Sequence, residues 1–418
     1  MISLSFQNKN VPVTAAEITR PATGVTAARG FKASGVHCGL RFKRADLAII
    51  ASDVPAATAC VFTTNLVKAA PLLVCQDQLS RNGGMSRALV VNAGNANACT
   101  GDQGTRDAWR TVHEAASLLG VAFPEVLVSS TGVIGLPLPM HALLSGLPEA
   151  VAALSAAGGS AAATAIQTTD TTLKEAVRVV DGPCGRYTVG GAAKGSGMIH
   201  PNMATTLGFV TSDAFLPPAV LQTVLRRATA RSFNRISVDG DTSTNDMVVV
   251  MANGASGVRL REGDRDQLAE FEVALTEVLV DLAKQVAADG EGATRLVTIT
   301  VRGAASEADA LQIGRTIATS QLVKTAIHGA DANWGRILAA AGRAGVVFDP
   351  ASARIVCNGL ELLDRNYRSD FDEIEASEHL ARDEVEIVFE IASGDAEATV
   401  WTCDLSREYV TINASYRS

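Results

Sequence analysis

One segment of the chain combines residue types that can cut a peptide bond and then act as a nucleophile. Residues 194–208 read KGSGMIHPNMATTLG and place Thr205 directly after Ala204, in a stretch rich in glycine that also contains a proline. A threonine hydroxyl is a weak nucleophile until a base accepts its proton. If the Ala204–Thr205 bond is cut, the freed α-amine of Thr205, which titrates at about 7.7–8.0, can serve as that base.

The segment alone does not identify a function, because an Ala-Thr-Thr triplet is common, and the usual catalytic and ligand motifs fail elsewhere in the chain. In residues 190–197, Lys194 precedes a glycine, whereas a phosphate-binding loop requires glycine, lysine and then serine or threonine. Residues 239–246 carry several carboxylates but lack the central glycine and closing glutamate of a calcium loop. The six histidines lack the spacing of metal ligands, so the sequence predicts no metal site.

Composition and charge exclude several classes of protein. The chain has 418 residues and a net charge of −8, and it lacks a lysine- and arginine-rich cluster of the kind that binds nucleic acid. The longest uncharged stretches, residues 126–148 and 150–169, are broken by glycine and proline or consist mainly of small residues, so neither is expected to span a membrane. The N-terminal residues lack the pattern of a secretory signal, and the seven cysteines are scattered. We therefore expect a cytoplasmic protein without disulfides.

Apolar periodicity predicts alternating strands and helices, which is typical of an α/β protein with layered sheets. Helical spacing predicts helices over residues 109–119 and 268–286. Apolar runs predict strands at residues 88–92, 126–130, 207–210, 294–301, 384–391 and 409–413. No shift in composition marks a domain boundary, so we expect the two halves of the chain to pack as one unit.

Loops rich in glycine and polar residues lie at the ends of these apolar runs. They are residues 92–101, 129–135, 190–206, 237–246 and 328–336. Binding and catalytic residues are often placed on such loops, although tight turns also require glycine for conformational reasons alone. The pattern therefore favours a site at the strand ends without specifying its chemistry.

The segment around Thr205 resembles the cleavage region of the ornithine acetyltransferase family, the bifunctional glutamate N-acetyltransferase/amino-acid acetyltransferase of arginine biosynthesis. The resemblance covers nearly the whole chain, with its motifs in the same order. These motifs are residues 30–39, 62–71, 92–101, 129–135, 168–171, 233–246, 289–296, 324–336 and 413–418. The resemblance implies an α/β sandwich with mixed sheets inside and helices outside, similar in architecture to N-terminal-nucleophile hydrolases and self-cleaving aminopeptidases.

The resemblance also implies a reaction. The precursor would cut itself into an α chain of residues 1–204 and a β chain of residues 205–418, which remain packed as one unit. Mature Thr205 would take the acetyl group of N2-acetylornithine, release ornithine and pass the acetyl group to glutamate in a ping-pong sequence. The family's oxyanion donors correspond to the Thr131 hydroxyl and the Gly132 backbone N–H. Taken alone, these two residues also fit an ordinary Thr-Gly turn.

The family's substrate contacts correspond to Thr168, Lys194, Thr205, Glu291, Asn413 and Ser418. Lys194 is a suitable partner for a substrate carboxylate and Glu291 for the ornithine ammonium. Without the resemblance, both residues also fit solvated charges on loops.

The sequence departs from the family pattern at three positions. Thr206 replaces a common methionine, His200 stands where smaller residues are frequent, and Ser418 replaces a threonine while keeping the hydroxyl. Because two threonines are adjacent, the cut could be placed before either. The alanine at position 204 favours the cut before Thr205.

Two other functions fit parts of the sequence. One is a self-cleaving amidohydrolase or aminopeptidase that passes the acyl group to water, and the other is a non-catalytic binding protein of the same fold. Lys194, Glu291 and the C-terminal NASYRS favour a transferase with amino-acid acceptors. The resemblance implies no prosthetic cofactor, and in some members of the family acetyl-CoA is a second acetyl donor. It further implies an α2β2 heterotetramer or a larger assembly.

Overall fold

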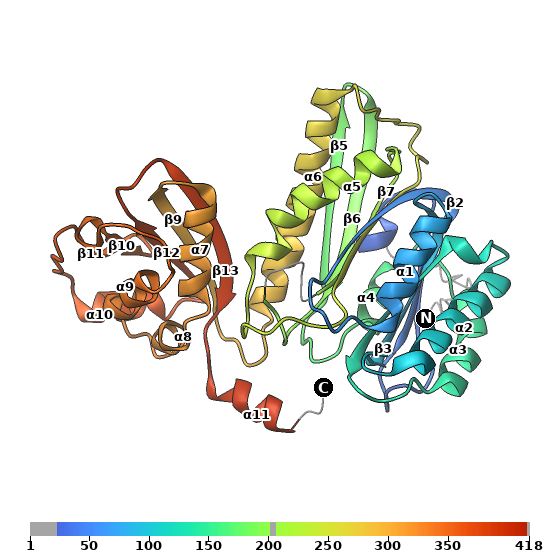
Figure 1. Ribbon diagram of the computed structural model, residues 1–418, viewed down its shortest axis with the longest axis horizontal. Helices are drawn as coiled ribbons and strands as arrows, with labels where there is room; N and C mark the ends of the chain where they lie inside the picture. Colours follow the sequence, from blue (N-terminus) through green and yellow to red (C-terminus); the bar gives the residue numbers. More distant parts are fainter. Residues whose placement is uncertain (1–22, 201–205, 416–418) are drawn as a thin grey trace, which may run out of the picture.

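The computed structural model describes residues 23–200 and 206–415 as a large lobe joined to a smaller one (Figure 1). The strands of the large lobe are β1 (Phe31–Val36), β2 (Leu47–Phe62), β3 (Met85–Asn95), β4 (Val126–Val133), β5 (Lys174–Gly182), β6 (Gly185–Lys194), β7 (Leu207–Ser212) and β8 (Met247–Ala252). Its helices are α1 (Ala70–Arg81), α2 (Gly101–Leu119), α3 (Met140–Ala152), α4 (Gly159–Ala165), α5 (Pro218–Ala230) and α6 (Arg265–Ala288). Short 3-10 turns cover Gly24–Thr26, Phe123–Glu125 and Phe233–Arg235.

The strands of the large lobe form a mixed sheet in the order β4-β3-β2-β8-β7-β6-β5, with β1 beside β2. β3 and β4 are parallel, as are β7 and β8, whereas the other neighbours are antiparallel. The pairing of β2 with β3 shifts between Ala51 and Ala56, and the second half of β2 pairs with β8. β7 and β8 are buried along their whole length, as expected for central strands whose residues are almost all apolar or small.

Helices cover the sheet and complete two cores. Side chains of β2, β3 and β4 pack with α1 to α4 and with Phe209 and Val249 from β7 and β8. The alternate residues of these two central strands, among them Val210 and Val248, pack with α5 and α6 instead. The site described below therefore lies on a framework that is buried on both sides.

The small lobe has its own sheet and its own core. Its strands are β9 (Leu296–Ala304), β10 (Arg354–Cys357), β11 (Leu360–Leu363), β12 (Glu384–Glu390) and β13 (Ala396–Cys403), in the order β11-β10-β12-β9-β13. Its helices are α7 (Glu307–Ala318), α8 (Gln321–His328), α9 (Trp334–Gly342) and α10 (Glu373–Leu380), with a 3-10 turn at Pro350–Ser352. The predicted α/β architecture with mixed sheets is thus confirmed.

Asp404 connects the segments that enter and leave the small lobe. Its carboxylate accepts hydrogen bonds from the Thr294 N–H at 2.7 Å, the Thr294 hydroxyl at 2.6 Å and the Arg295 N–H at 3.0 Å. It also lies 2.7 Å from Nδ1 of His328. Asp404 therefore fixes the chain immediately after the loop that carries Glu291.

Most predicted elements are found where the apolar pattern places them, but the strand predicted at residues 409–413 is wrong. These residues belong to helix α11 (Arg407–Ser415), which contains no buried residue. The β-branched residues Val410, Thr411 and Ile412 favour a strand. A stronger local signal overrides them: Ser406 accepts a hydrogen bond from the Glu408 N–H at 3.1 Å, which caps the helix N-terminus.

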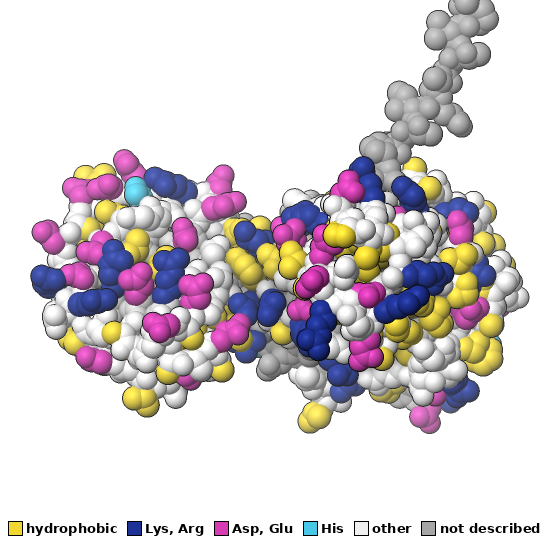
Figure 2. All heavy atoms as spheres, turned by 90° about the horizontal axis from the view of Figure 1, so that it is seen from above, with side chains coloured by type: hydrophobic (Ala, Val, Ile, Leu, Met, Phe, Trp, Pro, Cys, Tyr) yellow, Lys and Arg dark blue, Asp and Glu magenta, His cyan; other side chains and the backbone are white. Residues whose placement is uncertain are grey.

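The surface shows no large field of a single charge on the face seen from above. Basic and acidic side chains are interspersed over both lobes in this view (Figure 2). A protein that binds nucleic acid needs a basic stripe or patch, and this face does not present one. In the described part of the chain, every helix is too short or too polar to cross a membrane.

Candidate active site

A cavity of the large lobe brings together strand ends and loops that are far apart in the sequence. It is lined by the ends of β4 and β6, the start of β7, the loop before β8, the loops after α4 and α6, and helix α11. Six of the residues predicted from the sequence line it: Thr131, Gly132, Thr168, Lys194, Glu291 and Asn413. The other three, Ala204, Thr205 and Ser418, lie outside the described residues. Thr206, the second residue after the predicted cut, is also part of the wall.

The end of β4 carries the two predicted oxyanion donors. The β3–β4 register shifts at this point, so that Asn95 faces both Thr131 and Val133 across a bulge. Gly132 has φ = +131°, and a Cβ atom there would overlap the backbone of Gly94 and Asn95. Only glycine fits this position, and the bulge leaves a backbone N–H and a hydroxyl at an irregular strand end.

Asn245 holds this strand end against the start of β8. Its amide donates hydrogen bonds to the carbonyl oxygens of Ala96 at 2.6 Å and Ser130 at 2.8 Å. The Thr244 hydroxyl donates to the Asn245 Oδ1 at 2.7 Å, which fixes the orientation of the amide. The position of Thr131 relative to β7 and β8 is therefore set by buried hydrogen bonds.

β7, the strand that follows the predicted cut, is paired with its neighbours from its first residue, Leu207. The Met247 N–H donates to the Thr206 carbonyl at 3.2 Å, and Leu207 pairs with Lys194 across β6 and β7. Asp246, directly before β8, is a fully buried carboxyl group in the cavity wall. Burial raises its pKa well above the ordinary value for aspartate, which favours the neutral acid.

The chain on the other side of residues 201–205 is held by Asp239. Its two carboxylate oxygens accept hydrogen bonds from the N–H groups of Met198 at 2.6 Å and Ile199 at 2.9 Å. Met198 has φ = +57°, a conformation that is unusual for a side chain of this kind and requires support from its surroundings. The Ile199 carbonyl in turn accepts from the Val238 N–H at 2.8 Å. Residues 198 and 199 are therefore clamped against the loop before β8.

Lys194 is a buried cation at the end of β6. Within residues 23–200 and 206–415, its ammonium group makes no hydrogen bond and no ion pair at contact distance. Burial lowers its pKa, and the neighbouring Lys174 adds to this effect, whereas the carboxylates of Asp170, Asp246 and Glu291 raise it. A buried ammonium that lines a cavity and has no ion-pair partner at contact distance among the described residues can receive an anionic group of a ligand.

Glu291 and Asn413 meet in the cavity wall. The Asn413 amide donates to Oε2 of Glu291 at 2.8 Å, and the Glu291 N–H donates to the Ser196 carbonyl at 2.9 Å. Glu291 is thus oriented by the loop that precedes the predicted cut and by helix α11. Its carboxylate is placed to accept a hydrogen bond from a cationic group in the cavity.

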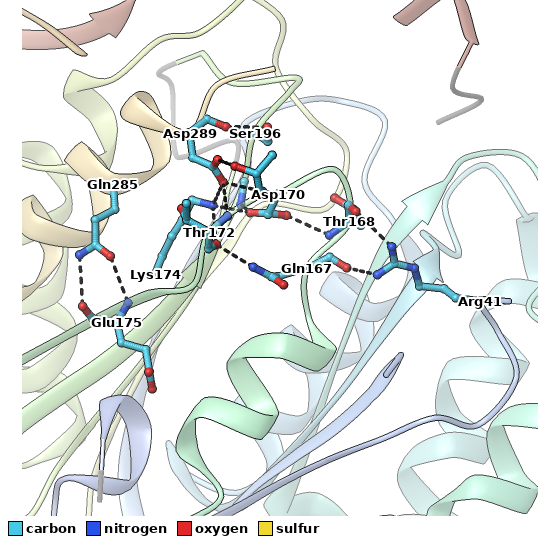
Figure 3. A network of polar contacts seen from close by, with 12 residues as sticks. Arg41, Gln167, Thr168, Asp170, Thr172, Lys174, Glu175, Ser196, Gln285 and Asp289 are labelled. Carbon is cyan, nitrogen blue, oxygen red and sulfur yellow. Dashed lines mark hydrogen bonds and ion pairs between the residues drawn. The ribbon is translucent and has the colours of Figure 1, made fainter. Parts of the chain in front are cut away.

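A network of polar contacts places Thr168 in the wall (Figure 3). The Arg41 guanidinium donates to the carbonyl oxygens of Gln167 at 2.6 Å and Thr168 at 3.1 Å. The Thr168 N–H donates to Asp170 at 2.9 Å, and Asp170 also accepts from the Gly195 N–H at 2.7 Å. Thr168 and the residue after Lys194 are therefore tied to the same carboxylate.

In the described part of the chain, no group of histidine, cysteine, aspartate and glutamate side chains is arranged to hold a metal ion. The cavity offers hydroxyl groups, a buried ammonium, carboxylates and an irregular strand end. These groups can bind a zwitterionic small molecule and stabilise negative charge on an oxygen atom.

Comparison with known proteins identifies the family. The model of the ArgJ family matches residues 32–418. The chain belongs to the ArgJ family. It is 49% identical over 402 residues to the arginine biosynthesis bifunctional protein ArgJ of Symbiobacterium thermophilum, covering 95% of this chain and 99% of that one. The family resemblance predicted from the sequence motifs is confirmed.

Solved structures give more limited matches. The ornithine acetyltransferase of Mycobacterium tuberculosis, solved in complex with ornithine, is 41% identical over 43% of this chain and 96% of its own, with a TM-score of 0.40. The L-aminopeptidase D-Ala-esterase/amidase of Ochrobactrum anthropi, described as a variant of the Ntn hydrolase fold, is 12% identical over 66% of this chain and 89% of its own, with a TM-score of 0.41.

The structure adds residues to the site that the sequence did not single out. Asp239 and Asn245 belong to the polar stretch at residues 237–246, so the polar composition of that loop was their only signal. Asp170 lies in the TTDT motif at residues 168–171, whose first threonine alone was selected. Lys174 had no signal, because a lone lysine at the start of a strand normally fits a solvated charge.

Proposed function

We propose that this protein transfers the acetyl group of N2-acetylornithine to glutamate, after cutting its own chain between Ala204 and Thr205. The supporting observation is that six residues selected through the family resemblance, from both sides of the predicted cut, line one cavity. Membership of the ArgJ family over nearly the whole chain supports arginine biosynthesis as the pathway and favours acyl transfer over hydrolysis.

The cleavage step needs only groups of the chain and one water molecule. The Thr205 hydroxyl attacks the Ala204 carbonyl carbon, the C–N bond breaks, and the hydroxyl proton passes to the departing α-amine. Water then hydrolyses the ester, which leaves a carboxylate on Ala204 and restores the Thr205 hydroxyl with a free α-amine beside it. The chain is held on both sides of this bond, by Asp239 at Met198 and by β8 at Thr206. Such restraint lowers the entropic cost of the attack.

In the transfer reaction, the α-amine accepts the proton of the Thr205 hydroxyl, which attacks the acetyl carbonyl of acetylornithine. The Thr131 hydroxyl and the Gly132 N–H donate to the oxygen on which negative charge develops. Ornithine leaves with a proton from the α-amine, and glutamate reverses the two steps. Lys194 pairs with the substrate carboxylate, Glu291 with the ornithine ammonium, and Thr168, Asn413 and Ser418 complete the substrate contacts.

The fold supports continued association of the two chains after cleavage. Residues 1–204 supply β6 and residues 205–418 supply β7 and β8, yet these strands pair within one sheet between β2 and β5. Separation would expose two buried strands. We further propose, on the family resemblance alone, an α2β2 heterotetramer or larger assembly in the cytoplasm, no prosthetic cofactor, and acetyl-CoA as a second donor to be tested with glutamate.

Incubation of the purified protein with acetylornithine, with and without glutamate, tests the proposal. The account predicts ornithine release that depends on glutamate, together with formation of acetylglutamate. Release at the same rate without glutamate would instead support the hydrolase alternative. Thr205→Ala should leave one uncut chain without activity, whereas Thr206→Ala should still be cut. An uncut wild-type chain would support a non-catalytic binding protein.

A further inference from the structure

Lys174 is a fully buried lysine that does not line the cavity. It belongs to the polar network that includes Thr168 and Asp170 (Figure 3). Its ammonium group contacts Oδ1 of Asp170 at 2.8 Å and the carboxylate of Asp289. The side chains of Lys174 and Asp170 have no exposed surface, and that of Asp289 is 7% exposed. Burying an unpaired charge costs free energy, so Lys174 and its two carboxylate partners stabilise one another as a buried ion-pair unit.

Each carboxylate of this unit fixes a different part of the predicted substrate-binding wall. Asp170 accepts the N–H groups of Thr168 and Gly195 and so determines the position of the backbone on both sides of the cavity. Asp289 accepts the N–H groups of Thr171 at 3.0 Å and Thr172 at 3.3 Å.

Asp289 is also connected to the predicted ammonium partner. Its carbonyl oxygen accepts the Ser196 hydroxyl at 2.6 Å, and the Ser196 carbonyl accepts the N–H of Glu291. Lys174 thereby links the loop of Thr168, the loop after Lys194 and the loop of Glu291.

The charges in this region are balanced between two lysines and two aspartates. Asp170 lies close to both Lys174 and Lys194, and their charges overcome the effect of burial and lower the pKa of Asp170 below its ordinary value. Asp170 therefore stays ionised and attracts both ammonium groups. Because Lys174 neutralises part of this attraction, less of it acts on Lys194. Without Lys174, the attraction of Asp170 for the Lys194 ammonium would no longer be shared with a second cation.

We propose that Lys174 is a positioning residue for substrate binding, which keeps the Lys194 ammonium available to the carboxylate of the substrate by neutralising Asp170 and Asp289. This inference rests on the proposed function, because it assigns the substrate carboxylate to Lys194. It extends that function by identifying a residue that acts without touching the substrate.

The Lys174→Met variant tests the proposal, because methionine keeps the length of the side chain and removes its charge. With the full-length protein, KM for acetylornithine and for glutamate should rise at least about tenfold, while kcat changes less than threefold and the chain is still cut. The decisive probe is acetylornithine amide, which lacks the carboxylate. Its KM should be the same in the variant and in the wild type.

Arg178→Met is the matched control. Arg178 lies on the same strand as Lys174, β5, and forms ion pairs with Glu277 at 2.9 Å and Asp281 at 2.6 Å of α6. Its position is partly exposed, and it does not line the cavity. The KM values of Arg178→Met for acetylornithine and for glutamate should stay within twofold of the wild-type values. Equal KM values for acetylornithine in wild type and Lys174→Met, or an equal rise for the acid and the amide, would overturn the inference.

A second variant keeps the test decisive if Lys174→Met does not fold. Lys174→Gln retains a hydrogen-bond donor toward Asp170 but not the charge, so it should show the same selective rise in KM for the acid. An unchanged KM in this variant would overturn the inference. The proposed function is tested separately, because its failure would appear as an inactive wild-type protein.

Discussion

Gly197 offers a direct test of the role assigned to Glu291. Gly197 lies in the loop before the predicted cut, and a Cβ atom at this position would overlap the carboxyl group of Glu291. The obstacle is the end of a flexible side chain and not backbone, and the φ of Gly197 lies outside the positive region that favours glycine. Gly197→Ala should therefore displace the Glu291 carboxylate without disrupting the fold.

The size of the effect follows from the contact that is lost. When the carboxylate moves, its 2.8 Å hydrogen bond from the Asn413 amide breaks, and the carboxylate no longer lies where an ornithine ammonium would pair with it. Hydrogen bonds to charged groups contribute roughly 1.5–3 kcal/mol. The bond that governs substrate affinity is the one between the Glu291 carboxylate and the ornithine ammonium. Loss of about 1.4 kcal/mol, near the lower end of this range, corresponds to a tenfold change in affinity.

Steady-state kinetics with acetylornithine and with glutamate as the varied substrate provide the assay. KM for acetylornithine should rise about tenfold in Gly197→Ala, and KM for glutamate should rise less, because glutamate has no terminal ammonium. The midpoint of thermal unfolding should stay within a few degrees of wild type. An unchanged KM for acetylornithine in a folded variant would refute the assignment of Glu291 as the ammonium partner.

Three further changes probe other parts of the site and fold. Thr131→Ala, which removes one oxyanion donor, should lower kcat by about 10²–10³-fold with little change in KM, and a kcat within threefold of wild type would exclude the role. Asp239→Asn, which replaces one of the two oxygens that accept from Met198 and Ile199, should slow self-cleavage about tenfold or more on gels of freshly purified precursor. Asp372→Asn, which makes the same chemical change at the N-terminus of α10 and keeps the oxygen that accepts both backbone N–H groups, should not slow it. Burial raises the pKa of Asp404, but its hydrogen bonds outweigh this effect and lower it below 3.8, so its stabilising contribution is present above this pH and lost below it. The midpoint of thermal unfolding, measured against pH, should fall in the wild type as the pH drops below this value. In Asp404→Asn the midpoint should depend less on pH.

The sequence predicts the elements of this fold where a single local signal dominates. The helix predicted at residues 268–286 is α6, and the apolar run at residues 384–391 is β12, because apolar spacing and burial agree in both. The strand prediction for the C-terminal segment is wrong because the cap at Ser406 outweighs the strand preference of its β-branched residues. Neither apolar periodicity nor β-propensity takes account of such a cap, so a short segment that carries both signals is assigned wrongly.

Sequence analysis selects some residues of the site and misses others. Six residues that line the cavity could be selected from the sequence, because the family resemblance assigns them to the oxyanion and substrate contacts. Lys174 and Asn245 could not be selected this way, since their roles come only from what the fold places beside them: two carboxylates in one case and two strand-end carbonyls in the other. Side chains that support a site carry no periodic or motif signal of their own.

The central claim is that Thr205 is released by cleavage and then carries the acetyl group. Intact-mass spectrometry of the purified protein, before and after addition of acetylornithine without glutamate, tests it most directly. The account predicts two polypeptides in place of the 43.4 kDa chain, with the second beginning at Thr205 and gaining one acetyl group that glutamate removes. A single uncut chain, or an acetyl group on any residue other than Thr205, would contradict it.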